Sequence, residues 1–283
     1  MLAFVLGSGG SRGALQVGAL QVLLEAGVQP DMVIGTSVGA LNAAFFAADP
    51  TLVGIEKLSS IWLQMNEKDI YPGNSATALW RMMRGRPSFY ENQTMHKLLQ
   101  QHLPVTYFHE LHLPCYAVAT DIDSGEIVAF GDRPDDLLKD GLMSSTALAP
   151  AHPPWEVGDR RFIDGGFGAV LPVRQAIERG ATTMIALNLT SPIQPRERGL
   201  NALEIMIHTS RLMMQQQMKI DLAFAAEHAD LTVLDLESDP LISVADFSKT
   251  VERIERGRVA AAQAFDQSLM PPARRRVRSL AQV

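Results

Sequence analysis

The pentapeptide Gly35-Thr36-Ser37-Val38-Gly39 is the feature that most restricts how this chain can fold. A short apolar run at residues 32–34 precedes it, and a helical pattern over residues 38–48 follows it. In a sharp turn from strand to helix, side chains at the positions of Gly35 and Gly39 would collide with neighbouring strands. The pattern therefore predicts that Ser37 stands above a sheet edge, at a helix N-terminus that favours developing negative charge. We interpret Ser37 as a nucleophile; a small-residue turn without chemistry is the alternative.

Apolar runs and helical patterns alternate along the first third of the chain. Residues 2–6 and 32–34 are predicted strands, and residues 14–26 and 38–48 are predicted helices. This β-α-β-α order predicts a three-layer α/β/α fold with a mostly parallel central sheet. Further along, the patterns predict hairpins around 121–125 and 158–159, helices at 173–179, 201–227 and 245–269, and strands at 183–189 and 231–236.

One domain is the expected organisation, because 283 residues suit a single α/β unit and the 47% hydrophobic content excludes a disordered chain. A segment at about 65–95 is poor in strand patterns and is expected to be an insertion or lid over the sheet. Residues 270–283 are expected to form a polar C-terminal tail.

The charge balance and the cysteine count narrow the class of protein. There are 25 Lys and Arg against 31 Asp and Glu, so a basic nucleic-acid-binding face is not expected. The single cysteine, Cys115, cannot form an intrachain disulfide. The N-terminus lacks the features of a signal peptide, and no apolar run approaches the ~18 residues of a membrane span. We expect a cytoplasmic protein whose membrane contact, if it has any, is peripheral at the inner membrane surface; the oligomeric state is left open.

A glycine-rich loop joins the first predicted strand to the first predicted helix. Its sequence is Gly7-Ser8-Gly9-Gly10-Ser11-Arg12-Gly13. The dinucleotide fingerprint fails, because its third glycine would fall at Arg12, and the P-loop pattern fails as well. Exposed backbone amides in such a loop suit an oxyanion, so an oxyanion hole is favoured over a simple tight turn.

Asp164 is the candidate base for the serine. It follows the predicted strand at 160–163 and precedes Gly165-Gly166, so it is expected at an exposed strand end. A turn-forming aspartate is the alternative, and spacing alone leaves both open. The histidines that follow it, His208 and His228, fall within the long helical pattern, where packing or solvent exposure is expected.

Three motifs in this order resemble the patatin-like phospholipase family. That family carries G-G-G-x-[RK]-G, then G-x-S-x-G, then D-G-[GA]; this chain has residues 8–13, 35–39 and 164–166 at the corresponding places. The stretches 35–43, 117–123, 144–154 and 247–256 are also similar. Ser8 departs from the pattern, since the family has glycine there.

The resemblance implies a Ser–Asp dyad instead of a triad. Ser37 would attack an ester carbonyl to form an acyl-enzyme, and Asp164 would take the proton and later activate water. The resemblance assigns the amides of Gly9, Gly10 and Ser11 to the oxyanion, with Arg12 nearby, and assigns Gly35 and Gly39 to the elbow. It implies a lipid ester substrate, phospholipid or lysophospholipid, with no cofactor and no metal.

Two rival functions and two surface features stay open at this stage. The rivals are a short-chain carboxylesterase on the same fold and a non-catalytic acyl-binding regulatory protein. The cluster Trp80, Met82, Met83 and Phe89 could line an acyl groove, touch lipid or simply pack within the insertion. The arginines at 274–278 could approach an anionic membrane or form a solvated tail.

Overall fold

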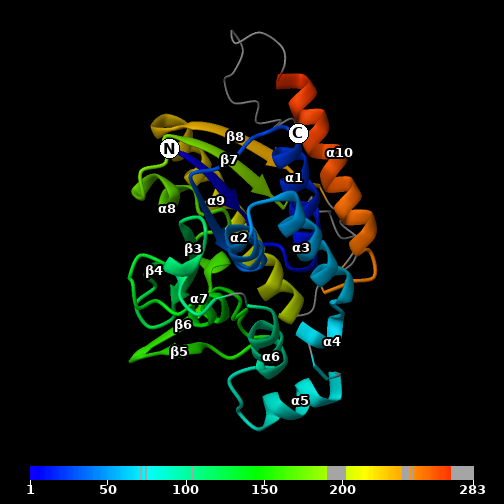
Figure 1. The fold of residues 1–283 in the computed structure, drawn as a ribbon. Coiled ribbons are helices and arrows are strands. Elements are labelled where there is room, and N and C mark those ends of the chain that lie inside the picture. Colours follow the sequence, from blue (N-terminus) through cyan, green and yellow to red (C-terminus); the bar gives the residue numbers. More distant parts are fainter. Residues whose placement is uncertain are drawn as a thin grey trace.

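A computed structural model gives the fold of the chain and describes residues 1–70, 72–73, 75–103, 105–189, 202–237, 243 and 245–268 (Figure 1). Its strands are β1 (Leu2–Leu6), β2 (Met32–Thr36), β3 (Cys115–Asp121), β4 (Ile127–Phe130), β5 (Trp155–Val157), β6 (Arg160–Asp164), β7 (Thr183–Asn188) and β8 (Asp230–Asp235). Its α-helices are α1 (Gly13–Glu25), α2 (Val38–Ala48), α3 (Leu52–Gln64), α4 (Glu67–Ile70), α5 (Ser75–Met83), α6 (Gln93–His102), α7 (Leu138–Ser145), α8 (Val173–Glu178), α9 (Ala202–His228) and α10 (Thr250–Ser268).

The strands form one mixed sheet in the order β5-β6-β3-β2-β1-β7-β8, with β4 paired to β3. The pairs β1–β2, β1–β7, β2–β3 and β7–β8 are parallel. The antiparallel pairs β3–β4 and β5–β6 are the two hairpins that the turn residues predict. The predicted mostly parallel sheet is therefore confirmed.

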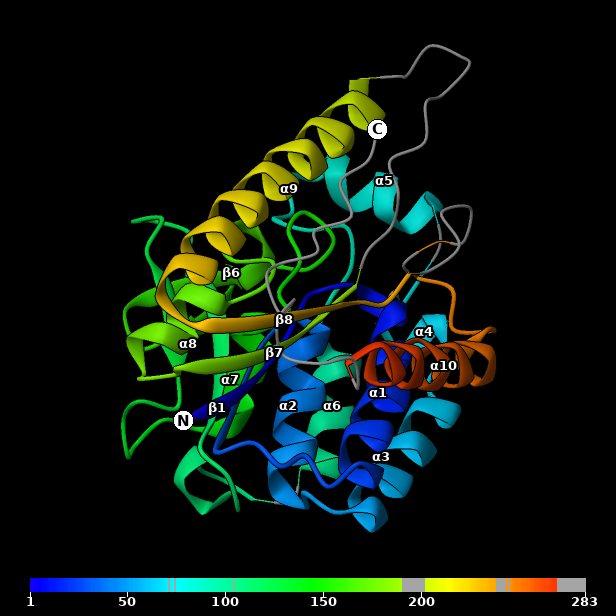
Figure 2. The same cartoon turned by 90° about the horizontal axis from the view of Figure 1, so that it is seen from above.

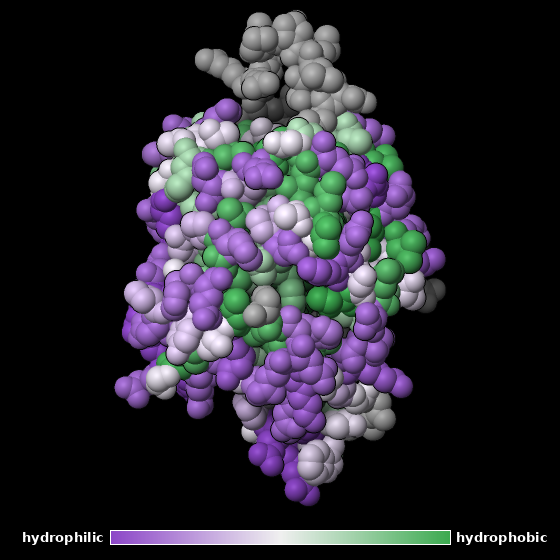
Figure 3. Space-filling model, viewed as in Figure 1, coloured by the Kyte–Doolittle hydropathy of each residue, from purple (hydrophilic) through white to green (hydrophobic). Residues whose placement is uncertain are grey.

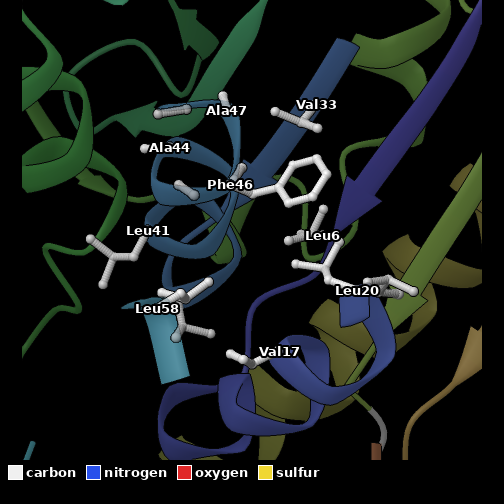
Figure 4. Close-up of a cluster of buried hydrophobic side chains, with 14 of the residues drawn as sticks. Leu6, Val17, Leu20, Val33, Leu41, Ala44, Phe46, Ala47 and Leu58 are labelled. Atoms are coloured by element: carbon white, nitrogen blue, oxygen red, sulfur yellow. The ribbon is translucent and has the colours of Figure 1, made fainter. Parts of the chain in front are cut away.

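Helices cover both faces of this sheet. Helices α1, α2, α3 and α10 lie on one side, and α8 and α9 lie on the other (Figures 1 and 2). Strand β1 shows why, because every residue from Ala3 to Leu6 is buried and successive side chains point to opposite faces. Phe4 and Leu6 join the core beneath α1 and α2, whereas Ala3 and Val5 join the core beneath α8. Figure 4 shows the first of these cores, where the Phe46 ring lies near Leu6 and Val33.

Helices α1 and α10 approach each other so closely that glycine is required at the crossing. A Cβ atom at Gly18 would lie 1.9 Å from the Ile254 carbonyl oxygen, and one at Gly257 would lie 1.9 Å from the Leu15 carbonyl oxygen. Real Cβ contacts are never this short, so neither position admits alanine without movement of a helix. The last described helix thus packs backbone to backbone on the helix that follows the glycine-rich loop.

The insertion at about 65–95 is helical where it is described, comprising α4, α5 and the start of α6. Phe89 is half-buried, whereas Trp80, Met82 and Met83 of α5 are exposed, and the Arg84 guanidinium lies 4.5 Å above the Trp80 ring. Figure 3 shows the face of the molecule that is seen in Figure 1. Hydrophobic side chains gather across its middle, above a hydrophilic tip where α5 lies. The insertion is held to the body because the amides of Phe89 and Tyr90 donate to the Pro150 and Ala151 carbonyls. Its function as a lid stays a prediction.

Some boundaries differ from the sequence patterns. Helix α3 was not expected, although Thr51 caps it by accepting a hydrogen bond from the Gly54 amide, which is a common helix start. Helix α10 begins at Thr250 instead of residue 245, because the Asp246 carboxylate accepts from the Ser248 amide and forms a turn there. The tail at 270–283, with its arginines, lies outside the described residues. Across the described ranges, no helix combines the length and apolar content that a membrane span needs.

Candidate active site

Ser37 occupies a strained turn between β2 and α2. Its φ of 57° and ψ of −125° make it the only described residue other than glycine with positive φ. Such a conformation costs about 1–3 kcal/mol and persists only where the surroundings enforce it. A Cβ at Gly39 would lie 2.2 Å from the Leu6 carbonyl of β1, and one at Gly35 would lie 2.2 Å from the Gly39 carbonyl. Close packing therefore demands both glycines, although at Gly35 the neighbour is the first turn of α2 and not the strand that we expected.

Ser145, at the end of α7, holds the backbone of this turn. Its Oγ accepts a hydrogen bond of 2.8 Å from the Ser37 amide and donates one of 2.6 Å to the Val118 carbonyl of β3. The Ser145 side chain is buried, so these bonds are protected from water. The sequence patterns did not single out Ser145, even though it lies within the familial stretch 144–154.

Asp164 ends β6 and points at Ser37. The Ser37 side chain lies within hydrogen-bonding reach of its carboxylate, and the Gly166 amide donates a hydrogen bond of 2.8 Å to Oδ1. The Asp164 amide in turn donates to the Ala147 carbonyl at 2.9 Å. Gly165 is required beside it, since a Cβ there would lie 2.1 Å from the Val118 carbonyl. The fold thus brings together the two residues that the resemblance pairs, from strands that are far apart in the sequence.

The environment of Asp164 suits a proton acceptor. Burial raises the pKa of Asp164 to about 6, although the hydrogen bonds from Ser37 and Gly166 lower it in part. No histidine is among the groups that set this pKa. His228 is engaged elsewhere, with its ring stacked on Phe224 and Nδ1 2.8 Å from the Phe224 carbonyl oxygen. A carboxylate that is ionised at neutral pH but more basic than usual therefore faces the serine.

The glycine-rich loop leaves three backbone amides free for an anion. The Ser8 amide donates to the Val170 carbonyl at 2.9 Å, and the Arg12 amide donates to the Gly9 carbonyl at 3.3 Å. In contrast, no carbonyl of the described residues accepts from the amides of Gly9, Gly10 or Ser11. Gly10 has φ 57°, which favours glycine and turns the loop into the short helix over Gly10–Arg12. The three amides that the resemblance assigns to an oxyanion are the ones without a partner in this part of the chain.

Buried amides fix this loop against the elbow. Gln16 Nε2 donates to the Gly7 and Leu187 carbonyls at 2.9 and 3.2 Å. Asn42 of α2 donates to Gln16 Oε1 at 2.9 Å and accepts from the Trp62 indole at 2.9 Å. The loop and the elbow consequently share one hydrogen-bonded network, in which Gln16 positions the loop.

Positive charge gathers beside the loop. Arg253 of α10 is buried, and its Nη1 donates to Ser11 Oγ at 3.0 Å, to the Ser11 carbonyl at 3.4 Å and to the Asp246 carbonyl at 2.5 Å. Burial, together with the charges of Arg211 and Arg253, lowers the pKa of Arg12 to about 10. Arg12 Nε is buried and has no hydrogen-bond partner among the described residues. This electrostatic field favours an anion at the free amides.

Among the described residues, no three His, Cys, Asp or Glu side chains lie close enough to hold a metal ion. Cys115 is buried on β3, and burial raises the pKa of its thiol above the ordinary value.

Comparison with known proteins gives the family. A family model described as patatin-like phospholipase matches residues 4–177, which is more than half of the chain. The chain belongs to the patatin-like phospholipase family. The family predicted from the three motifs is therefore confirmed. Phospholipases, after which this family is named, hydrolyse lipid esters.

The relatives in this family are much longer than the chain. Patatin-like phospholipase domain-containing protein 6 of Mus musculus is 30% identical over 192 residues, which cover 67% of this chain but 14% of the relative. Lysophospholipase NTE1 of Saccharomyces cerevisiae is 28% identical over 200 residues, covering 67% of this chain and 11% of the relative. The crystal structure of VipD from Legionella pneumophila superposes with a TM-score of 0.51 at 13% identity, covering 94% of this chain and 66% of VipD. That likeness concerns the three-layer fold.

Proposed function

We propose that this chain is a serine acyl hydrolase that cleaves lipid esters through a dyad of Ser37 and Asp164. The observation that carries the proposal is the Ser37 side chain within hydrogen-bonding reach of the Asp164 carboxylate, which is buried and whose pKa is raised to about 6. The lipid class follows from the family and from relatives whose names are phospholipase and lysophospholipase. The cytoplasmic location expected from the sequence stays a prediction.

The geometry supports a two-step reaction. Ser37 Oγ attacks the ester carbonyl while Asp164 accepts the hydroxyl proton, and the alcohol leaves with that proton. The amides of Gly9, Gly10 and Ser11 stabilise the negative oxygen of the tetrahedral intermediate, and a backbone donor of this kind is worth roughly 3–4 kcal/mol. Asp164 then deprotonates a water molecule that attacks the acyl carbonyl; the Ser37 Oγ–acyl bond breaks, Asp164 returns the proton to Ser37 Oγ, and the fatty acid leaves.

Replacement of the nucleophile tests the proposal. Ser37→Ala should lose ester hydrolysis and labelling by a fluorophosphonate, with a fall of several orders of magnitude. Ser60→Ala is the matched control, since Ser60 is exposed on α3 and its hydroxyl bonds only to the Glu56 carbonyl. Both variants should unfold at the wild-type temperature. Activity above about a tenth of the wild-type value in Ser37→Ala would remove Ser37 from the mechanism.

Two rival functions give different results with the same material. A short-chain carboxylesterase would hydrolyse nitrophenyl acetate and butyrate but not lysophospholipid or phospholipid. A non-catalytic acyl-binding protein would bind fatty acid without being labelled by the fluorophosphonate. The proposal requires labelling at Ser37 together with release of fatty acid from a phospholipid or lysophospholipid.

A further inference from the structure

The N-terminal half of α9 is an exposed apolar surface beside the candidate active site. Its C-terminal half is anchored, since Ala225 is buried and the Asp221 carboxylate accepts from Arg174 of α8. Figure 2 shows the helix running from β8 and α8 to an end that projects beyond the sheet. Along that end, five large apolar side chains are exposed: Ile205, Met206, Ile207, Leu212 and Met213. All of this lies beyond residues 4–177, which the family model matches.

The two hydroxyl side chains within this surface are satisfied by the helix itself. Thr209 Oγ1 donates to the Ile205 and Met206 carbonyls at 2.9 and 3.0 Å, and Ser210 Oγ donates to the Met206 carbonyl at 2.9 Å. Hydroxyls that bond back to their own helix do not need water as an acceptor. The surface can therefore enter an apolar medium without leaving these donors unpaired.

The charges along α9 indicate which partner suits this surface. No Asp or Glu occurs between Glu204 and Asp221, although the whole chain carries a net charge of −6. Arg211 and Lys219 are the cationic side chains in that interval. A second copy of the chain would bring like charges together across a two-fold axis, whereas an anionic lipid surface would neutralise them.

The other edge of the same helix touches the active site. The Met214 methyl lies 3.3 Å from the point where a Cβ at Gly166 would stand, next to Asp164 Oδ1. Arg211, one helical turn before Met214, lies close enough to Arg12 for its charge to act on that side chain. One helix thus connects an exposed apolar surface with the carboxylate and the glycine-rich loop.

We propose that residues 205–213 of α9 form a lipid-docking surface, which inserts Met206 and Met213 among the acyl chains of an anionic bilayer. Met206 and Met213 are seven residues apart and share one side of the helix. The stretch carries no acidic side chain that would repel an anionic headgroup, and the surface delivers the ester to Ser37. This inference rests on the proposed function for its catalytic consequence, but the binding itself does not require catalysis.

The test compares two double variants of equal exposure. Met206→Glu with Met213→Glu alters side chains that are 52% and 73% exposed, and the control Val53→Glu with Val251→Glu alters side chains that are 57% and 70% exposed on α3 and α10. Binding is measured by sedimentation with vesicles of phosphatidylcholine and phosphatidylglycerol. The α9 variant should bind at least about tenfold more weakly, because two apolar side chains no longer leave water. The control should bind like the wild type, and vesicles of phosphatidylcholine alone should bind all proteins less tightly.

Catalysis separates this inference from the proposed function. The α9 variant should lose hydrolysis of vesicle phospholipid about tenfold while keeping fluorophosphonate labelling and hydrolysis of soluble nitrophenyl butyrate. Equal vesicle binding by the α9 variant and the wild type, equal losses in both double variants, or a wild-type dimer that the α9 variant breaks would each overturn the docking surface. Failure of the proposed function looks different: wild type would not label, yet the α9 variant would still reduce vesicle binding.

Discussion

The amide of Ser37 and the hydroxyl of Ser145 form a 2.8 Å hydrogen bond that couples the strained elbow to the end of α7. The same hydroxyl donates to the Val118 carbonyl at 2.6 Å, so one serine bridges the elbow and β3. The φ of 57° at Ser37 is therefore held by a partner outside its own turn as well as by the glycines within it.

Ser145→Ala should damage both stability and turnover. Removing the hydroxyl leaves the Ser37 amide and the Val118 carbonyl buried without partners, which costs about 1–3 kcal/mol for each unsatisfied group. The free energy of unfolding and kcat should both fall. Ser144→Ala is a close control, because the Ser144 hydroxyl is also buried but finds no hydrogen-bond partner in the part of the chain that the structure describes. That variant should be as stable as the wild type or more so; similar losses in both would assign the effect to packing of α7.

Asp164→Asn should be nearly inactive and yet more stable near neutral pH. The pKa of Asp164 rises from 3.8 to about 6 on folding, so the folded protein holds this proton more tightly than the unfolded chain. The carboxyl therefore stabilises the fold most below about pH 4, and this contribution is lost as the pH rises to about 6. The free energy of unfolding should fall by about 3 kcal/mol over this range because of Asp164, whereas a neutral asparagine does not titrate and causes no such fall. Denaturant unfolding at pH 4 and pH 7 measures it; a variant less stable than the wild type at pH 7 would contradict the cost of the buried charge.

The pH dependence of kcat/KM should report the same group. Asp164 accepts a proton only when it is ionised, so kcat/KM on a soluble ester should rise with pH, with a midpoint near the pKa of about 6. The rate should then level off. A midpoint near the ordinary aspartate value of about 4 would mean that the carboxyl is not desolvated in the working enzyme.

Histidine substitutions decide between a dyad and a triad. His208→Gln and His228→Gln, singly and together, should keep most activity because neither ring is among the groups acting on Asp164. The measurement is kcat/KM alongside Asp164→Asn. A histidine variant that folds but is as inactive as Asp164→Asn would make the mechanism a triad.

Arg253→Met should lower kcat with little change in KM, since Arg253 is buried behind the loop and acts on it through Ser11. Losing its bonds to the Ser11 hydroxyl and carbonyl should loosen the loop and cost about tenfold in kcat. Arg256→Met, on the exposed side of α10, should behave like the wild type. A rise in KM at constant kcat would place Arg253 in substrate binding instead.

The elements that the sequence predicts well are those whose structure depends on residues close together in the sequence. Strand β1 matches its expected bounds because the five consecutive apolar residues Leu2–Leu6 end at a glycine, and the elbow follows from two glycines that close packing requires. The pairing of Ser37 with Asp164 could be predicted only from the family resemblance. Spacing alone did not decide whether Asp164 is a catalytic base or a turn-forming residue. Ser145 and Arg253 could not be found as positioning residues, because their roles depend on hydrogen bonds between elements that only the folded chain brings together.

The glycine crossing of α1 and α10 sets a boundary for engineering. Leu15 and Gly18 meet backbone atoms of Ile254 and Gly257 directly, with no side-chain layer between the helices that a shorter chain could repack. A fragment trimmed to the family match at 4–177 would expose this bare helix surface next to the glycine-rich loop. Grafts, circular permutants and minimal versions of this chain should therefore extend through Ser268, treating α1 and α10 as one inseparable unit.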